Sequence, residues 1–237
     1  ADGKRMVWAS GVEDTLWSPN SDEFWQWTND LIIEYAKISA EMPTLFGVFL
    51  DYENYSNMGT PNCYDLSYDD LIMGSFARSK GITLPEIPFE ERQAWLQDQG
   101  LYEEFEAFQV AHWRERCRTL REAVDAIDPT FMFMIYPAPG TKFMVDACYP
   151  EWATDEAPLI LADASTYGRV AILPHEEALE ANRDMLLANQ EFAHSKGDNL
   201  LYTGGIDPVV KGADPEFSGR NAAMIMEVTD GYWIFYE

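Results

Sequence analysis

Short apolar runs alternate with longer amphipathic segments along the 237-residue chain. The run at residues 45–53, LFGVFLDYE, is nearly continuous and is typical of a parallel strand that is buried on both faces. Runs of this kind predict six strands, at residues 6–10, 45–53, 131–136, 159–164, 200–205 and 231–237. Apolar positions three or four residues apart predict helices at residues 22–40, 69–79, 90–127, 175–195 and 215–227.

Strands that alternate with helices favour an α/β fold with a parallel sheet. A doubly wound sheet and a (β/α)8 TIM-type barrel both have this order. The barrel is favoured because acidic residues stand at the C-terminal ends of several strands, where barrel enzymes carry their chemistry. In addition, no GxGxxG or GxxxxGK[ST] motif follows any strand.

Six strands are two fewer than a (β/α)8 barrel needs, and no helix follows the last one to cover its outer face. We therefore expect a single barrel domain over residues 1–237 that is incomplete in this chain. The expected missing parts are N-terminal strands and the last helix.

The charge of the chain limits its partners. It has 41 acidic and 16 basic residues and a net charge of -25, which repels phosphate backbones and anionic lipid. No apolar run approaches the ~18–20 residues of a membrane-spanning helix. We expect no nucleic-acid partner and no membrane insertion, and the acidic, lysine-poor composition suits a secreted, periplasmic or cell-surface protein.

Cysteine and histidine are sparse, with three residues of each and no CxxC motif. This argues against a disulfide framework and a structural zinc site, although one disulfide remains open. We expect neither a metal nor a cofactor.

The strand at residues 45–53 carries the strongest candidate chemistry. Because side chains alternate along a strand, Phe49, Asp51 and Glu53 share one face, with the two carboxylates roughly 6–7 Å apart. Such a pair can separate two pKa values and leave one carboxyl protonated as a general acid, as cleavage of a glycosidic bond requires. In the alternative interpretation, Asp51 and Glu53 only cap the strand and bind loop amides.

This segment resembles the strand-four motif D-G-x-D-x-D-x-E of glycoside hydrolase family 18, the chitinase-like barrels. Gly47, Asp51 and Glu53 match the motif, whereas Phe46 and Phe49 replace its first two aspartates. The resemblance implies that Glu53 is the general acid and that Asp51 orients the acetamido group of the substrate. More broadly, the chain resembles uncharacterised bacterial barrel proteins described as glycosidase-like.

Later strands follow the family less closely. Asp163 matches the aspartate of a Tyr-Asp pair at the end of strand six, but Ala162 replaces its tyrosine. Phe235 or Tyr236 stands where strand eight of the family has a tryptophan. These departures weaken the implied substrate-assisted mechanism and the N-acetyl specificity.

Without substrate assistance, a second carboxylate must act as the nucleophile. Asp163 is the preferred assisting carboxylate; Asp207 and Glu237 are the other candidates, although Asp207 also fits a turn before Pro208. Aromatic rings can stack on the apolar faces of sugars. The expected substrate-binding residues are Tyr55, Tyr136, Asp207, Trp233 and Glu237.

The sequence therefore predicts a glycoside hydrolase that acts on a poly- or oligosaccharide, with Glu53, Asp51 and Asp163 as its catalytic residues. The alternative is a non-catalytic glycan-binding or structural barrel protein of a surface assembly, because a degenerate enzyme would also lose motif aspartates. A metal-dependent barrel hydrolase is a third option, disfavoured by the few histidines. The expected partner is a carbohydrate, and the sequence leaves the oligomeric state open.

Overall fold

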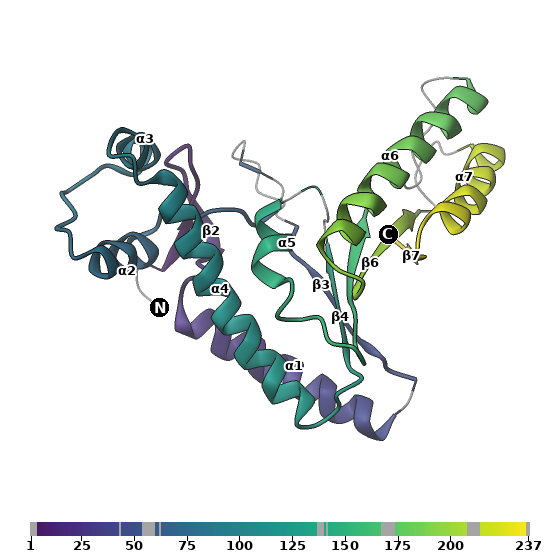
Figure 1. Cartoon of the computed structure of the whole chain (residues 1–237), viewed down its shortest axis with the longest axis horizontal. Coiled ribbons are helices and arrows are strands. Elements are labelled where there is room, and N and C mark those ends of the chain that lie inside the picture. Colours follow the sequence, from purple (N-terminus) through teal and green to yellow (C-terminus); the bar gives the residue numbers. More distant parts are fainter. Residues whose placement is uncertain are drawn as a thin grey trace.

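The computed structural model describes residues 4–42, 44–53, 60–61, 63–136, 140, 142–166, 174–207 and 214–235. These residues form a mixed α/β fold around a curled, five-stranded parallel sheet, which is half of a barrel (Figure 1). The strands lie side by side in chain order: β3 (Gly47–Asp51), β4 (Met132–Tyr136), β5 (Leu159–Asp163), β6 (Leu200–Ile206) and β7 (Gly231–Ile234). The α/β class and the parallel order are confirmed, whereas a complete barrel is not shown.

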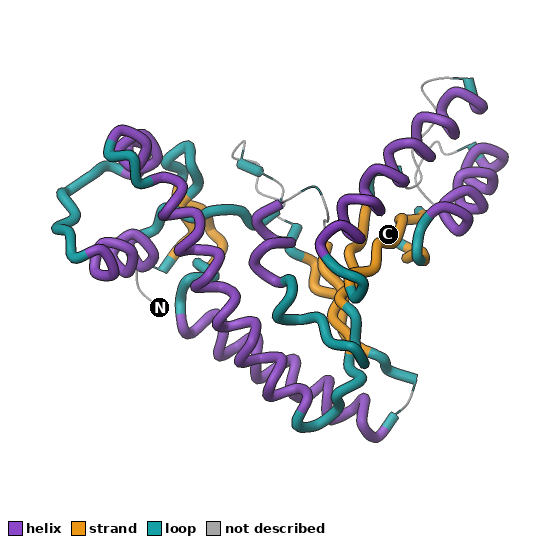
Figure 2. The backbone as a smooth tube through the Cα atoms, viewed as in Figure 1, coloured by secondary structure: helices purple, strands orange, loops and turns teal. Residues whose placement is uncertain are grey.

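Seven α-helices and one short 3-10 helix are present in the described residues (Figure 2). They are α1 (Asp22–Glu41), α2 (Asp70–Lys80), η1 (Phe89–Glu91), α3 (Arg92–Asp98), α4 (Tyr102–Asp125), α5 (Lys142–Cys148), α6 (His175–Lys196) and α7 (Pro215–Val228). Helix α1 packs on β3, and α6 and α7 pack on β6. Helix α4 packs on α1 and α5. Among these helices, none is both long enough and apolar enough to cross a membrane.

The N-terminal segment differs from its prediction as a strand of the parallel sheet. Strand β1 (Arg5–Val7) pairs antiparallel with β2 (Glu13–Trp17), and the two form a separate small sheet. Gly11 lies between them with φ of 81°, a conformation that glycine adopts without steric cost, and the chain turns back there. The parallel sheet therefore has five strands in the described residues, one fewer than predicted.

The predicted helix at residues 90–127 is divided. Helix α3 ends before Gly100, whose φ is 66°, and α4 begins directly afterwards at Tyr102. The short helix α5 is absent from the sequence prediction. The other four predicted helices match α1, α2, α6 and α7 to within one residue at each end.

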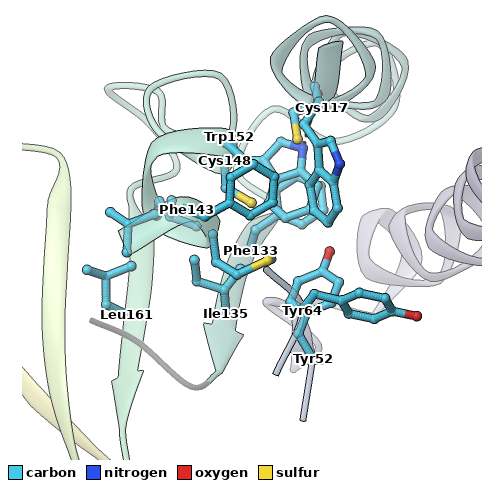
Figure 3. Packing of buried hydrophobic residues seen from close by; sticks show 14 of the residues in the cluster. Tyr52, Tyr64, Cys117, Phe133, Ile135, Phe143, Cys148, Trp152 and Leu161 are labelled. Atoms are coloured by element: carbon cyan, nitrogen blue, oxygen red, sulfur yellow. Dashed lines mark hydrogen bonds between the residues drawn. The ribbon is translucent and has the colours of Figure 1, made fainter. Parts of the chain in front are cut away.

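The core lies between the sheet and its helices, on the outer face of the half-barrel. Phe133, Ile135 and Leu161 point from β4 and β5 into this layer (Figure 3). There the Phe133 ring stacks on Trp152 with a centroid distance of 4.7 Å. A separate, smaller cluster contains Tyr136, Ala162 and Trp233 on the opposite, concave face. Alternation along each strand therefore decides whether a side chain enters the helix-covered core or the concave face.

Candidate functional site

Four aromatic side chains meet on the concave face, toward the C-terminal ends of the strands. We call this group, Phe49, Tyr136, Trp233 and Phe235, the aromatic floor. Tyr136 and Phe49 lie 5.1 and 5.4 Å from Trp233 between ring centroids, and Phe235 lies 6.1 Å from it. Tyr136 and Trp233 are nearly buried, whereas Phe49 is 45% exposed. Phe49 is therefore the part of the floor that is most exposed to solvent.

A glycine on β6 makes room for the tryptophan of the floor. A Cβ atom at Gly205 would lie 2.9 Å from the Trp233 ring and 2.7 Å from the carbonyl oxygen of Asp163. The Trp233 Nε1 donates a hydrogen bond of 3.0 Å to that same carbonyl. Close approach of the indole to the backbone of β5 and β6 therefore requires glycine at this position.

Asp51 lies at the end of β3, next to the aromatic floor. It is in register with Tyr136 on β4, and residues in register on parallel strands share a face. Its Oδ1 accepts a hydrogen bond of 2.8 Å from the backbone N–H of Glu53. This is the loop-amide contact expected of a capping residue, and it also holds Asp51 beside Glu53.

Glu53 follows β3 and is half-buried. Its backbone forms an antiparallel bridge with Cys63, which brings the segment at residues 63–66 back to the strand end. The intervening Tyr52 points to the helix-covered side, where its ring packs against Tyr64 and Trp113. The segment that carries both candidate carboxylates is thus anchored from the core side.

Asp163 lies elsewhere than expected. Its Oδ2 accepts hydrogen bonds from the Tyr202 hydroxyl and, at 2.9 Å, from Nδ2 of Asn189 on α6. Its Oδ1 accepts one of 2.6 Å from the backbone N–H of Ser165. The carboxylate is 3% exposed and faces the helices, away from the concave face. This placement differs from the expected assisting role at the barrel mouth, because it is the neighbouring Ala162 that faces inward.

The contact between Tyr202 and Asp163 also affects the protonation of the phenol. Burial raises the pKa of Tyr202, and the nearby Asp163 carboxylate raises it further. The phenol therefore stays protonated as a hydrogen-bond donor. Asp163 and Tyr202 form a satisfied polar pair within the core, as buried carboxylates require.

The remaining predicted residues divide into two groups. Asp207 follows β6 directly and is 2% exposed, at the same end of the sheet as Asp51. Tyr136 and Trp233 belong to the aromatic floor. Tyr55 and Glu237 lie outside the described residues. The structure thus brings Asp51, Tyr136 and Trp233 to one face and places Asp163 on the other.

Sequence reasoning missed an acid near the end of β3. Asp65 lines a cavity of about 380 Å³, together with Cys63, Glu106 and Lys142. Burial raises the pKa of the Asp65 carboxyl, and the hydrogen bond from the Leu66 amide offsets part of this rise. Nothing in the polar stretch at residues 54–68 distinguishes Asp65 from an ordinary loop residue. Its surroundings depend on contacts with α4 and α5 that are distant in sequence.

Phe49 has a place in the site that the sequence does not predict, since the motif comparison shows only the loss of an aspartate there. The structure makes it the most exposed ring of the aromatic floor.

Among the described residues, no three His, Cys, Asp or Glu side chains lie together as a metal site would require. No protein-family model matches the chain, and no curated protein matches its sequence.

Proposed function

We propose that this protein is a glycoside hydrolase that acts on an oligo- or polysaccharide bound along the concave face. One observation carries this proposal: Asp51 and the neighbouring Glu53 stand beside the aromatic floor at the carboxyl end of a parallel half-barrel. Catalytic residues of barrel enzymes lie at this end of the strands. The exposed ring of Phe49 offers an apolar surface for a sugar ring.

In the proposed mechanism, Glu53 is the general acid/base and Asp51 its electrostatic partner. Asp207, buried at the end of β6, replaces Asp163 as the second carboxylate because Asp163 is engaged within the core. A separation of about 5–5.5 Å between the two acting carboxyl groups would give retention of configuration, and about 6.5–9.5 Å would give inversion. An extracellular or cell-surface location suits a polymeric substrate.

The half-barrel belongs, in this proposal, to a (β/α)8 barrel that further strands complete. In the described residues, β3 and β7 each have a strand partner on one side only. Helix α1 exposes an apolar stripe at Trp27, Leu31, Tyr35 and Ile38, with exposed fractions between 42% and 66%. A neighbouring strand and helix of a closed barrel would cover both the edge of β3 and this stripe.

The test is hydrolysis by the variant Glu53→Gln. Removing a general acid costs about 10²–10⁴-fold in rate, so release of reducing ends from chitohexaose or cellohexaose should fall by that factor. Circular dichroism checks that the fold is intact. The control Glu227→Gln changes an exposed carboxylate on α7 that pairs with Arg183, and it should retain full activity. Hydrolysis by Glu53→Gln at the rate of the unmodified protein would remove Glu53 from the mechanism.

The second candidate is a non-catalytic glycan-binding or structural barrel protein. Two observations favour it: Asp163 faces the helices, and Asp51 already binds the Glu53 amide. In that case neither the unmodified protein nor Glu53→Gln would hydrolyse oligosaccharides. If the protein binds glycans, both forms would still bind the oligosaccharides through the aromatic floor; if it is only structural, neither form would bind them.

A further inference from the structure

A surface pocket of about 440 Å³ lies where the N-terminal hairpin meets the start of α1. We call it the hairpin pocket, and its volume lies within the roughly 300–1,000 Å³ that is typical of small-molecule sites. Four aromatic side chains line it: Trp17 from β2, Phe24 and Trp27 from α1, and Tyr64 from the segment after β3. Trp27 is also the first residue of the apolar stripe on α1. An element packed on that stripe would border the pocket there, because the other walls come from β2 and Tyr64.

Both tryptophan rings of the hairpin pocket are open to solvent. Trp27 is 66% exposed and Trp17 is 40% exposed, although tryptophan is highly buried on average. The Arg5 guanidinium covers one face of the Trp17 ring, 4.4 Å from its centroid, and also donates to the carbonyl oxygen of Thr15. Arg5 therefore holds the Trp17 side chain in place and leaves the other face of the ring for a ligand.

The other two rings of the hairpin pocket are anchored to the core. Phe24 packs edge-on against Tyr64 with a centroid distance of 6.2 Å, and Tyr64 packs against Tyr52 at 6.0 Å. The Tyr64 hydroxyl also donates a hydrogen bond of 3.3 Å to the carbonyl oxygen of Trp17, which ties it to the end of β2. Walls that are already held in place need little ordering when a ligand binds, which favours affinity.

The charged groups beside the hairpin pocket are already engaged. Glu23, which lines the pocket, forms an ion pair with Lys4 through its Oε1 atom. The hydrogen bond from Lys4 lowers the pKa of Glu23, so this carboxylate stays ionised at neutral pH. An ionic ligand would compete with these contacts or with those of Arg5, whereas Oε2 of Glu23 can accept a hydrogen bond from a neutral ligand. The pocket therefore favours an uncharged ligand with apolar faces and hydroxyl groups at its edge.

We propose that the hairpin pocket is a second carbohydrate-binding site, in which a sugar ring stacks on Trp27 and donates a hydroxyl hydrogen bond to Glu23. A sugar ring combines apolar C–H faces, which suit an aromatic ring, with a rim of hydroxyl groups. The choice of a sugar rests on the proposed function, whose substrate is an oligo- or polysaccharide.

The hairpin pocket adjoins the proposed catalytic segment but lies on the other side of the end of β3. Tyr64 directly follows Cys63, whose backbone bridges to Glu53, while the Tyr64 ring packs on Tyr52 on the helix-covered side (Figure 3). Asp51 and the aromatic floor face the opposite, concave side. The pocket would therefore hold a glycan near the concave face without taking part in its cleavage.

The test measures binding of chitohexaose and cellohexaose to Trp27→Ala by isothermal titration calorimetry. The matched control Tyr35→Ala removes another exposed ring of α1, 42% exposed, that does not line the pocket. Both variants are made in the unmodified chain and in Phe49→Ala, which weakens the aromatic floor, and circular dichroism checks each fold. In the Phe49→Ala chain, we expect Trp27→Ala to raise the dissociation constant of at least one oligosaccharide by about tenfold. Tyr35→Ala should leave that dissociation constant unchanged.

The outcomes separate this proposal from the hydrolase activity. Unchanged affinity in Trp27→Ala in both chains would overturn the hairpin pocket, and weaker binding in Phe49→Ala would then leave the proposed function standing. Binding that depends on Trp27, by a chain that hydrolyses neither oligosaccharide, would support the pocket and count against the hydrolase. If neither oligosaccharide binds to the unmodified chain, both proposals fail. Aromatic pockets also bind quaternary ammonium groups, so binding of choline chloride that depends on Trp27, without binding of either oligosaccharide, would overturn the sugar as the ligand.

Discussion

At the scale of single residues, the side of the strand on which each acidic candidate lies decides whether it enters the core or the concave face. Asp163 and Ala162 are neighbours, yet Asp163 binds Tyr202 in the core while Ala162 faces the concave side. The presence of acidic residues at the strand ends could be predicted from the sequence. The face of β5 on which Asp163 lies could not be predicted, because the run LILADA is apolar on both sides of the strand. On β3, by contrast, the shared face of Phe49 and Asp51 could be predicted from alternation alone.

The structural role of Asp163 predicts the effect of a single hydroxyl deletion. In Tyr202→Phe, the buried carboxylate loses one donor, which should lower the free energy of unfolding by about 1–3 kcal/mol. Urea unfolding measures this change. The matched control Tyr232→Phe removes a hydroxyl from a side chain on β7 that is 51% exposed, and it should alter stability by less than about 0.5 kcal/mol. Equal stability of Tyr202→Phe and the unmodified chain would mean that the Asp163 contact is not structural.

At the scale of elements, apolar periodicity located the long helices and the parallel strands because packing on the sheet imposes that periodicity. It failed at two glycines. Gly11 turns the N-terminal hairpin and Gly100 separates α3 from α4, both with positive φ. The helical spacing of apolar residues continues on both sides of Gly100, so periodicity alone does not end a helix there. Strand β2, EDTLW, was missed because two of its five residues are acidic.

The conformations of two glycines predict opposite effects of the same substitution. Gly100 has φ of 66°, and no atom lies within 4 Å of an added Cβ. Gly100→Ala should therefore lower the free energy of unfolding by about 1–2 kcal/mol, from backbone strain alone. Gly219 lies inside α7, and again no atom lies within 4 Å of an added Cβ. Gly219→Ala should raise the free energy of unfolding by about 0.5–1 kcal/mol, because alanine loses less conformational freedom than glycine in a helix. Denaturant unfolding compares the two variants. A stabilising Gly100→Ala would indicate that α3 and α4 can join as one continuous helix.

At the scale of the whole molecule, the candidate site draws on parts of the chain far apart in sequence. The aromatic floor joins Phe49 from β3 to Trp233 from β7, the two edges of the sheet. The parallel order of the strands could be predicted from their alternation with helices. The meeting of these rings could not, because it depends on the curl of the sheet and on the room left by Gly205.

The central claim is that carbohydrate binds on this concave face, and a pair of phenylalanines tests it most directly. Isothermal titration calorimetry would measure binding of chitohexaose and cellohexaose to Phe49→Ala and to its control Phe46→Ala, which removes a ring that is 65% exposed just before β3. We expect Phe49→Ala to raise the dissociation constant of at least one oligosaccharide by about tenfold, because one contact between an aromatic ring and the sugar is lost. Phe46→Ala should leave the dissociation constant unchanged. Binding to Phe49→Ala with unchanged affinity, or no binding of either oligosaccharide to the unmodified chain, would contradict the claim.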